Sequence, residues 1–142
     1  MKDFALMRHA ETDGNGKITK ESLEVLIRVA SKFSDEVGVC DVKIYHSPTT
    51  RARVTAHTFA KHLNRISTNA SAEVIGKLQW LDCESFGVRD ANIARVLHPD
   101  SFALLISHQP DMGNYLVGIG YTGGLRLTNC SVYSPGFVIS GH

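Results

Sequence analysis

The sequence predicts an α/β fold in which a mostly parallel sheet is covered by helices on both faces. Two continuous apolar runs, at residues 4–7 and 102–106, are typical of strands that are buried on both sides. Segments with apolar residues spaced three and four apart alternate with the strand-like runs, as in strand–helix–strand units. We therefore expect a single domain, residues 1–142, built as a three-layer α/β/α sandwich.

The first predicted strand ends abruptly in a charged pair. Its apolar residues stop at Met7, and Arg8 and His9 follow directly. At the carboxyl end of a strand in an open α/β sheet, side chains can meet a ligand instead of packing under helices. An isolated pair of this kind is more often a solvated cation and a packed edge histidine. Its interpretation therefore depends on residues farther along the chain.

Two amphipathic helices and a strand are predicted next. The first helix covers residues 18–33, with Thr19 as its N-cap, and follows a loop at residues 13–16. A short strand is expected at residues 42–45 and a second helix at residues 49–63. The apolar positions that give each helix one buried face are Leu23, Leu26, Ile27, Ala30 and Phe33 in the first, and Ala52, Ala56, Phe59, Ala60 and Leu63 in the second.

The middle of the chain carries weaker signals. A weak strand is expected at residues 73–75, and an irregular segment follows at residues 78–88. A short helix begins at Arg89 or Asp90 and continues to the His-Pro pair at residues 98–99, because the residue before a proline disfavours helix.

The strand at residues 102–106 is the clearest in the sequence, because polar residues bound it on both sides. Like the first strand, it is followed by a histidine, His108. The remaining predicted elements are a helix at residues 111–117 and late strands at residues 125–127 and 132–139, with a turn or bulge at Pro135 and Gly136.

The composition argues against several classes of partner. The chain has 15 Lys and Arg against 14 Asp and Glu, a formal net charge of +1, and no basic block, so we expect neither nucleic-acid nor membrane binding. No apolar run is long enough for a signal peptide or a membrane span. The cysteines of the chain are Cys40, Cys83 and Cys130. They form no Cys-x-x-Cys pair, which argues against a disulfide framework or a zinc site and favours a reducing, cytoplasmic location.

The loop after the first strand is partly similar to a calcium-binding EF-hand loop. The matching residues are Asp13, Asn15, Gly16 and Ile18. The twelfth position of such a loop needs a bidentate glutamate but holds Ser22, and a strand precedes the loop where an EF-hand has a helix. We therefore expect no calcium at this loop.

Three predicted strands end in residues that suit an anion-binding site. They end in Arg8 and His9, in His46-Ser47-Pro48 with Arg51 just beyond, and in Ser107 and His108. In a mostly parallel sheet these ends meet at one edge. Guanidinium groups bind phosphate oxygens through paired hydrogen bonds, and an imidazolium adds another charged donor. The sequence therefore predicts a pocket for a dianionic phosphoryl group.

These motifs resemble those of a known family. Residues 8–12, Arg-His-Ala-Glu-Thr, resemble the Arg-His-Gly nucleophile motif of the histidine phosphatase (phosphoglycerate mutase-like) superfamily. Residues 47–52 are similar to its Ser-Pro-x-x-Arg-Ala motif, and residues 107–108 to its second catalytic histidine. The motifs occur in the family's order across most of the chain, which implies a phosphoglycerate mutase-like fold. The short length resembles the SixA-like branch of protein phosphohistidine phosphatases.

The resemblance implies roles for four residues. His9 would be the nucleophile and would carry a phosphohistidine intermediate. Arg8, Arg51 and His108 would hold the phosphoryl oxygens and neutralise charge in the transition state. No metal and no cofactor would be required. The implied substrate is a phosphorylated protein, carrying phosphohistidine, or a small phosphorylated metabolite.

Three further residues are weaker candidates for substrate binding. Asn15 matches an asparagine that contacts phosphate in longer relatives, but in a Gly-Asn-Gly loop we expect it to be a turn residue. Asp82 and Glu84 fall in the region of the family's general acid without a defining motif, and solvation at the surface is the alternative for each. Ala10 stands where the family usually has glycine, but alanine also occurs at this position in the short branch.

The missing motif for the acid bears on the substrate. An alkoxide leaving group needs a proton from a positioned acid, whereas the nitrogen of a phosphohistidine departs more readily. We therefore expect cleavage of a P–N bond. The alternatives are a phosphomonoesterase for small metabolites and a non-catalytic phosphate- or phosphoprotein-binding module on the same fold.

Overall fold

A computed structural model describes residues 4–82, 88–109, 111–121 and 128–141, with only the backbone of Asp82. Its sheet has six strands in the order β3-β2-β4-β1-β5-β6. The strands are β1 (Phe4–Arg8), β2 (Cys40–His46), β3 (Ala70–Lys77), β4 (Ser101–Ser107), β5 (Val132–Tyr133) and β6 (Val138–Ile139). The helices are α1 (Lys20–Val37), α2 (Thr50–Ile66), α3 (Asp90–Ala94) and α4 (Asp111–Gly118), with a 3₁₀ turn, η1 (Gln79–Asp82).

The four longer strands, β1 to β4, pair in parallel, and the two short late strands, β5 and β6, pair antiparallel. β4 lies between β1 and β2, so the ends of all three strands lie next to one another. Arg8 pairs with Ser107 across β1 and β4, and His46 pairs with Ile106 across β2 and β4. This register brings the three polar strand ends to one edge of the sheet.

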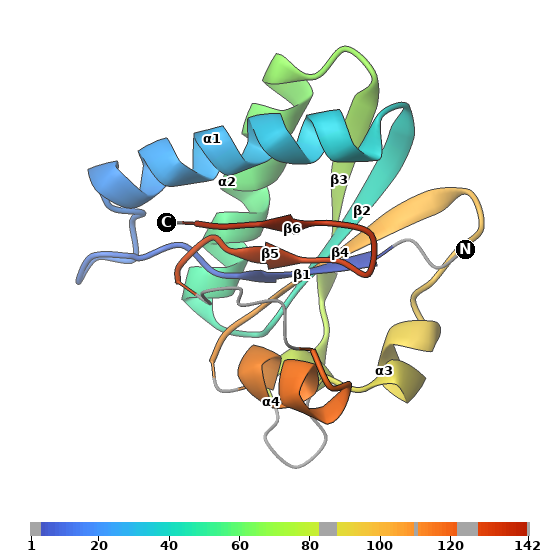
Figure 1. Ribbon diagram of the computed structural model, residues 1–142. Coiled ribbons are helices and arrows are strands. Elements are labelled where there is room, and N and C mark those ends of the chain that lie inside the picture. The colour runs from blue at the N-terminus through green and yellow to red at the C-terminus, as the bar shows by residue number, and fades with distance from the viewer. Residues whose placement is uncertain (1–3, 83–87, 110, 122–127, 142) are drawn as a thin grey trace.

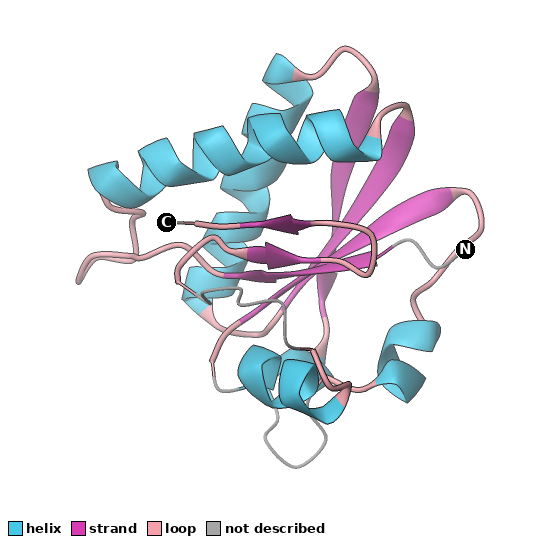
Figure 2. Ribbon diagram, viewed as in Figure 1, coloured by secondary structure: helices cyan, strands magenta, loops and turns pink. Residues whose placement is uncertain are grey.

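The two faces of the sheet are covered by different helices (Figures 1 and 2). Side chains alternate along β1, so that Ala5 and Met7 pack in the cluster formed with α1 and α2. Phe4 and Leu6 point to the opposite face and pack in the cluster formed with η1, α3 and α4. The predicted three-layer α/β/α sandwich with a mostly parallel sheet is confirmed.

Phe33 of α1 is the centre of the larger apolar cluster. Its ring lies edge-on to Phe59 of α2 at 5.4 Å and to Phe102 of β4 at 5.5 Å between ring centroids. Edge-to-face aromatic pairs of this kind stabilise a core beyond the area that they bury. These contacts fix both helices on the sheet and therefore fix the position of the first turn of α2.

Several predicted boundaries are confirmed and others shift. Thr19 is the N-cap of α1, with its hydroxyl accepting from the Ser22 amide at 3.2 Å, and α1 therefore begins at Lys20. Thr49 caps α2 in the same way. The prediction that α3 reaches Pro99 was wrong, because the helix ends at Ala94. The next two amides, of Arg95 and Val96, donate to carbonyls three residues earlier, as in a 3₁₀ turn.

The predictions for the other strands are confirmed in part. β3 is longer than the predicted strand at residues 73–75. The interruption expected at Pro135 and Gly136 is confirmed, because residues 132–139 form two short strands, β5 and β6, joined by a turn at these two residues. The strand predicted at residues 125–127 lies outside the described residues. In the described parts of the chain, no helix has both the length and the apolar character needed to cross a bilayer.

Candidate active site

The carboxyl ends of β1 and β4 form a topological switch point in the sheet. The two strands are parallel neighbours, but the helix after β1 packs on one face of the sheet and the helix after β4 packs on the other. Connections that diverge in this way leave a crevice where ligands bind in open α/β sheets. His9 and His108 follow the two strands, and their ring centroids lie 6.3 Å apart.

A cavity of about 500 Å³ opens beside His9. It brings together Arg8 and Arg51, which come from β1 and from the first turn of α2. With His108 beside His9, the four residues predicted to bind a phosphoryl group gather at one edge of the sheet. The residues that line the cavity are Arg8, His9, Glu11, Thr12, Asp13, Gly14, Arg51 and Asn129.

The surroundings of His9 favour a neutral imidazole that carries its proton on Nδ1 and none on Nε2. Its Nδ1 lies 2.7 Å from the Ala10 carbonyl oxygen, and because a carbonyl only accepts, Nδ1 carries the proton. Burial lowers the pKa of His9 below its ordinary 6.5, and the positive charges of Arg51, Arg8 and His108 lower it further, against the opposing effect of the hydrogen bond to Ala10. A neutral imidazole with an unprotonated nitrogen can act as a nucleophile.

Arg51 occupies an unusual position for a cation. The first turn of α2 contains no acidic residue, although the positive end of a helix dipole favours acidic side chains and disfavours basic ones. The backbone amides at this end of α2 and the Arg51 guanidinium both favour a bound anion. The arrangement is therefore better suited to anion binding than to stabilising the helix.

The backbone after β1 is held from several sides. The Arg8 amide donates to the Ser131 carbonyl and the His9 amide to the Ser107 carbonyl, both at 3.0 Å. The side chain of Ala10 is completely buried, which explains why a small residue follows the histidine. The segment that carries the proposed nucleophile is therefore a fixed part of the fold.

Three polar side chains in contact with this segment were not singled out from the sequence for this role. Thr55 accepts from the Ala10 amide at 2.9 Å, Ser22 accepts from the Glu11 amide at 2.9 Å, and Asn129 donates to the His9 carbonyl at 2.9 Å. Thr55 follows Arg51 by one helical turn, which is a signal that sequence reasoning could have used. Asn129 is 120 residues away from His9 in the chain, and no local pattern indicates the contact.

Of the three weaker candidates, only Asn15 has a described side chain. Asn15 is exposed and its amide donates to Asp13 Oδ1 at 2.8 Å, as expected of a turn residue. The Leu81 carbonyl accepts from the buried Ser107 hydroxyl at 2.9 Å, so the backbone leading to Asp82 lies at the same edge of the sheet. The side chain of Asp82 and all of Glu84 lie outside the described residues.

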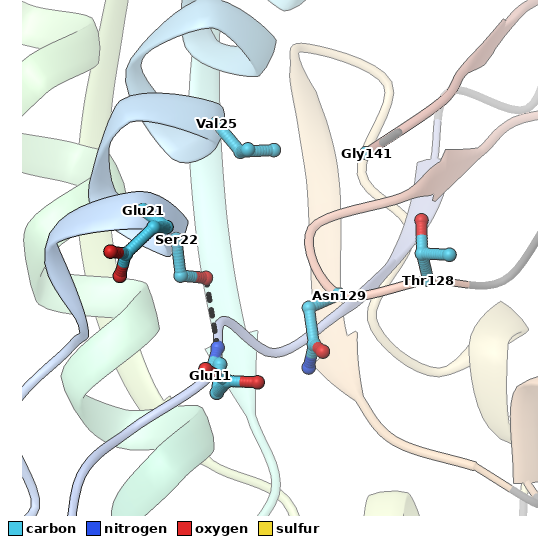
Figure 3. Close-up of a pocket in the computed structure, with 7 residues that line it drawn as sticks. All are labelled: Glu11, Glu21, Ser22, Val25, Thr128, Asn129 and Gly141. Carbon is cyan, nitrogen blue, oxygen red and sulfur yellow. Dashed lines mark hydrogen bonds between the residues drawn. The ribbon is translucent and has the colours of Figure 1, made fainter.

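A smaller cavity of about 200 Å³ adjoins the first (Figure 3). Glu11 and Asn129 line both cavities. The remaining lining residues are Glu21, Ser22, Val25, Thr128 and Gly141.

No group of three or more His, Cys, Asp or Glu side chains within the described ranges is placed to hold a metal ion.

Gly141 packs against the backbone that carries Asn129. A methyl group at Gly141 would lie 2.9 Å from the Ser131 nitrogen and would clash with the Asn129 carbonyl oxygen. We expect Gly141→Ala to lower the free energy of unfolding by roughly 1–3 kcal/mol, because the backbone has to move. Urea denaturation measures this change. Gly136→Ala is the control, since nothing lies within 4 Å of a methyl group there. Equal unfolding midpoints for the two variants would contradict the tight packing.

Comparison with known proteins gives structural but not sequence matches. No protein-family model and no curated protein matches the sequence. A protein from Agrobacterium tumefaciens assigned as phosphohistidine phosphatase SixA is similar in structure, with a TM-score of 0.64 and 14% identity over 98% of this chain and 96% of that chain.

Two further solved structures are similar. One is assigned as a SixA protein from Nakamurella multipartitia, with a TM-score of 0.58 and 18% identity over 96% of this chain and 86% of that chain. The other is phosphoglycerate mutase from Plasmodium falciparum, with a TM-score of 0.54 and 21% identity over 97% and 89%. The chain therefore has the phosphoglycerate mutase-like fold that SixA proteins share with phosphoglycerate mutase.

Proposed function

We propose that this chain is a histidine phosphatase that uses His9 as its nucleophile. The observation that carries the proposal is the contact of His9 Nδ1 with the Ala10 carbonyl, which leaves Nε2 as the unprotonated nitrogen, next to His108 and the cavity that Arg8 and Arg51 line. Such a site provides one nucleophile and several donors for phosphoryl oxygens. Positioning and charge neutralisation are what phosphoryl transfer mainly requires.

The reaction has two steps. In the first, His9 Nε2 attacks phosphorus in line, so that a P–N bond to His9 forms while the bond to the leaving group breaks. Arg8, Arg51 and His108 hold the phosphoryl oxygens and offset their negative charge. In the second step, water attacks the phosphorus and His9 departs as neutral imidazole, because Nδ1 keeps its proton throughout. The protons of the water molecule go to the phosphate product and to solvent.

The proposed substrate is phosphohistidine in a protein. Two proteins with this fold are assigned as phosphohistidine phosphatases, which supports the substrate class by likeness of fold. An imidazole leaving group departs with less help from an acid than an alkoxide does. Asp82 and Glu84 remain predictions for the proton donor that an ester substrate would need.

A rapid-quench experiment tests the proposal. The protein is mixed with a ³²P-phosphohistidine protein or with a small phosphate monoester, and the label on the enzyme is followed with time. We expect a burst of acid-labile, alkali-stable label, as phosphohistidine gives, and faster turnover of the phosphohistidine protein. Faster turnover of the monoester would overturn the substrate class. Binding of phosphate without turnover of either compound would instead support a non-catalytic module.

A further inference from the structure

We propose that Ser22, Thr55 and Asn129 are positioning residues that fix the orientation and tautomer of the His9 imidazole. The proposal rests on the proposed function in so far as His9 is the nucleophile. None of the three residues needs to touch the substrate for this role. They act through two consecutive peptide groups, His9–Ala10 and Ala10–Glu11.

No carboxylate among the described contacts holds the His9 ring; a backbone carbonyl does. The His9 Nδ1 donates to the Ala10 carbonyl oxygen at 2.7 Å. The second nitrogen is free to react only while this bond keeps the proton on Nδ1. The direction of the Ala10 carbonyl therefore decides where the ring points and which nitrogen is available.

Ser22 fixes the direction of that carbonyl. A peptide group is planar, and its N–H and C=O point in opposite directions, so an anchored N–H anchors the carbonyl as well. The N–H of the Ala10–Glu11 peptide belongs to Glu11, and it donates to the Ser22 hydroxyl at 2.9 Å (Figure 3). The Ser22 side chain is buried on the first turn of α1, where it has little freedom to move.

Thr55 and Asn129 fix the preceding peptide group, His9–Ala10. Thr55 accepts from its N–H and Asn129 donates to its carbonyl, both at 2.9 Å. The fully buried Thr55 hydroxyl also donates to the Arg51 carbonyl at 2.7 Å. The same side chain therefore links the nucleophile to the helical turn that carries Arg51. Hydroxyls from α1 and α2 and an amide from the segment before β5 together fix both peptide groups.

The test measures the tautomer of His9 directly. Two-bond ¹H–¹⁵N spectra of protein labelled with ¹⁵N-histidine distinguish a proton on Nδ1 from a proton on Nε2. In the wild type we expect His9 with its proton on Nδ1. Ser22→Ala and Thr55→Val should increase the form with the proton on Nε2 and lower kcat by about tenfold to a hundredfold, with a smaller change in KM.

Matched variants separate positioning from packing. Thr55→Ser keeps the hydroxyl and should restore both the tautomer and most of the turnover. Ser31→Ala and Thr58→Val make the same chemical changes at other positions of α1 and α2 and should alter neither. The signals of His46, whose Nδ1 lies 2.8 Å from the Ser47 carbonyl, serve as a reference within each spectrum.

Each outcome decides one of the two proposals. If Ser22→Ala and Thr55→Val retain the Nδ1 tautomer and full kcat while only their Tm falls, the contacts are structural and the positioning role is wrong. If the tautomer changes as expected but the wild type hydrolyses no phosphoryl compound, the positioning role stands and the proposed function fails. If Ser22→Ala does not fold, Thr55→Val against Thr55→Ser gives the same decision.

Discussion

Replacement of His9 by alanine is expected to lower phosphatase turnover by at least about a hundredfold and to abolish labelling of the enzyme by phosphate. Alanine removes the nitrogen that would form the covalent bond, while Arg8, Arg51 and His108 keep their capacity to bind the anion. The variant should therefore still bind inorganic phosphate. Turnover and acid-labile label, measured on the same samples, check both parts of the expectation.

His57→Ala is the matched control for His9. His57 is an exposed histidine on α2, and its substitution removes the same side chain without touching the cavity. We expect unchanged turnover and unchanged labelling. Normal labelling in His9→Ala would show that another residue is the nucleophile and would remove the basis of the proposed mechanism.

Substitution of Arg51 by methionine should have the second largest effect. Loss of a cation that holds the transferred phosphoryl group should lower kcat/KM by on the order of a hundredfold. It should also raise the pKa of His9, because a positive charge near the imidazole disfavours protonation of the ring. Burial, the largest cause of the lowered pKa, remains in the variant, so the pKa should stay below 6.5.

The two effects have separate readouts. An NMR titration of the His9 Cε1–H gives its pKa without any substrate, and steady-state kinetics gives kcat/KM. Because the neutral imidazole is the reactive form, a higher pKa should shift the acid side of the activity profile to higher pH. Arg53→Met, an exposed arginine two positions along α2, should change neither quantity. An unchanged pKa of His9 in Arg51→Met would contradict the electrostatic contact.

The edge of the sheet could be predicted from sequence because each of its strands carries its own signal. The apolar runs before Arg8 and Ser107 and the short strand signal before His46 identify parallel strands, and the geometry of such strands brings their ends together. Thr19 could be identified as the N-cap of α1 because its signal is also local, whereas Thr49, predicted as the first residue of α2, is the N-cap of that helix.

What sequence reasoning missed depends on tertiary structure. The early end of α3 reflects hydrogen bonds that tighten after Ala94, and helical spacing does not encode this change. Asn129 contacts His9 only because β5 pairs beside β1, and the pairing partner of a two-residue strand cannot be inferred from its own sequence. Thr55 and Ser22 are ordinary polar residues in helices until the folded structure places peptide groups against them.

The hydrogen bonds from residues 129–131 to the end of β1 also bear on the order of folding. The contact between Asn129 and His9 closes a loop of 120 residues, whereas β2 pairs with β3, the next strand along the chain, in the same sheet. Contacts between distant segments form late, because the entropy of closing a long loop is lost before they can stabilise the chain. The imidazole of His9 should therefore reach its reactive orientation only in the last stages of folding.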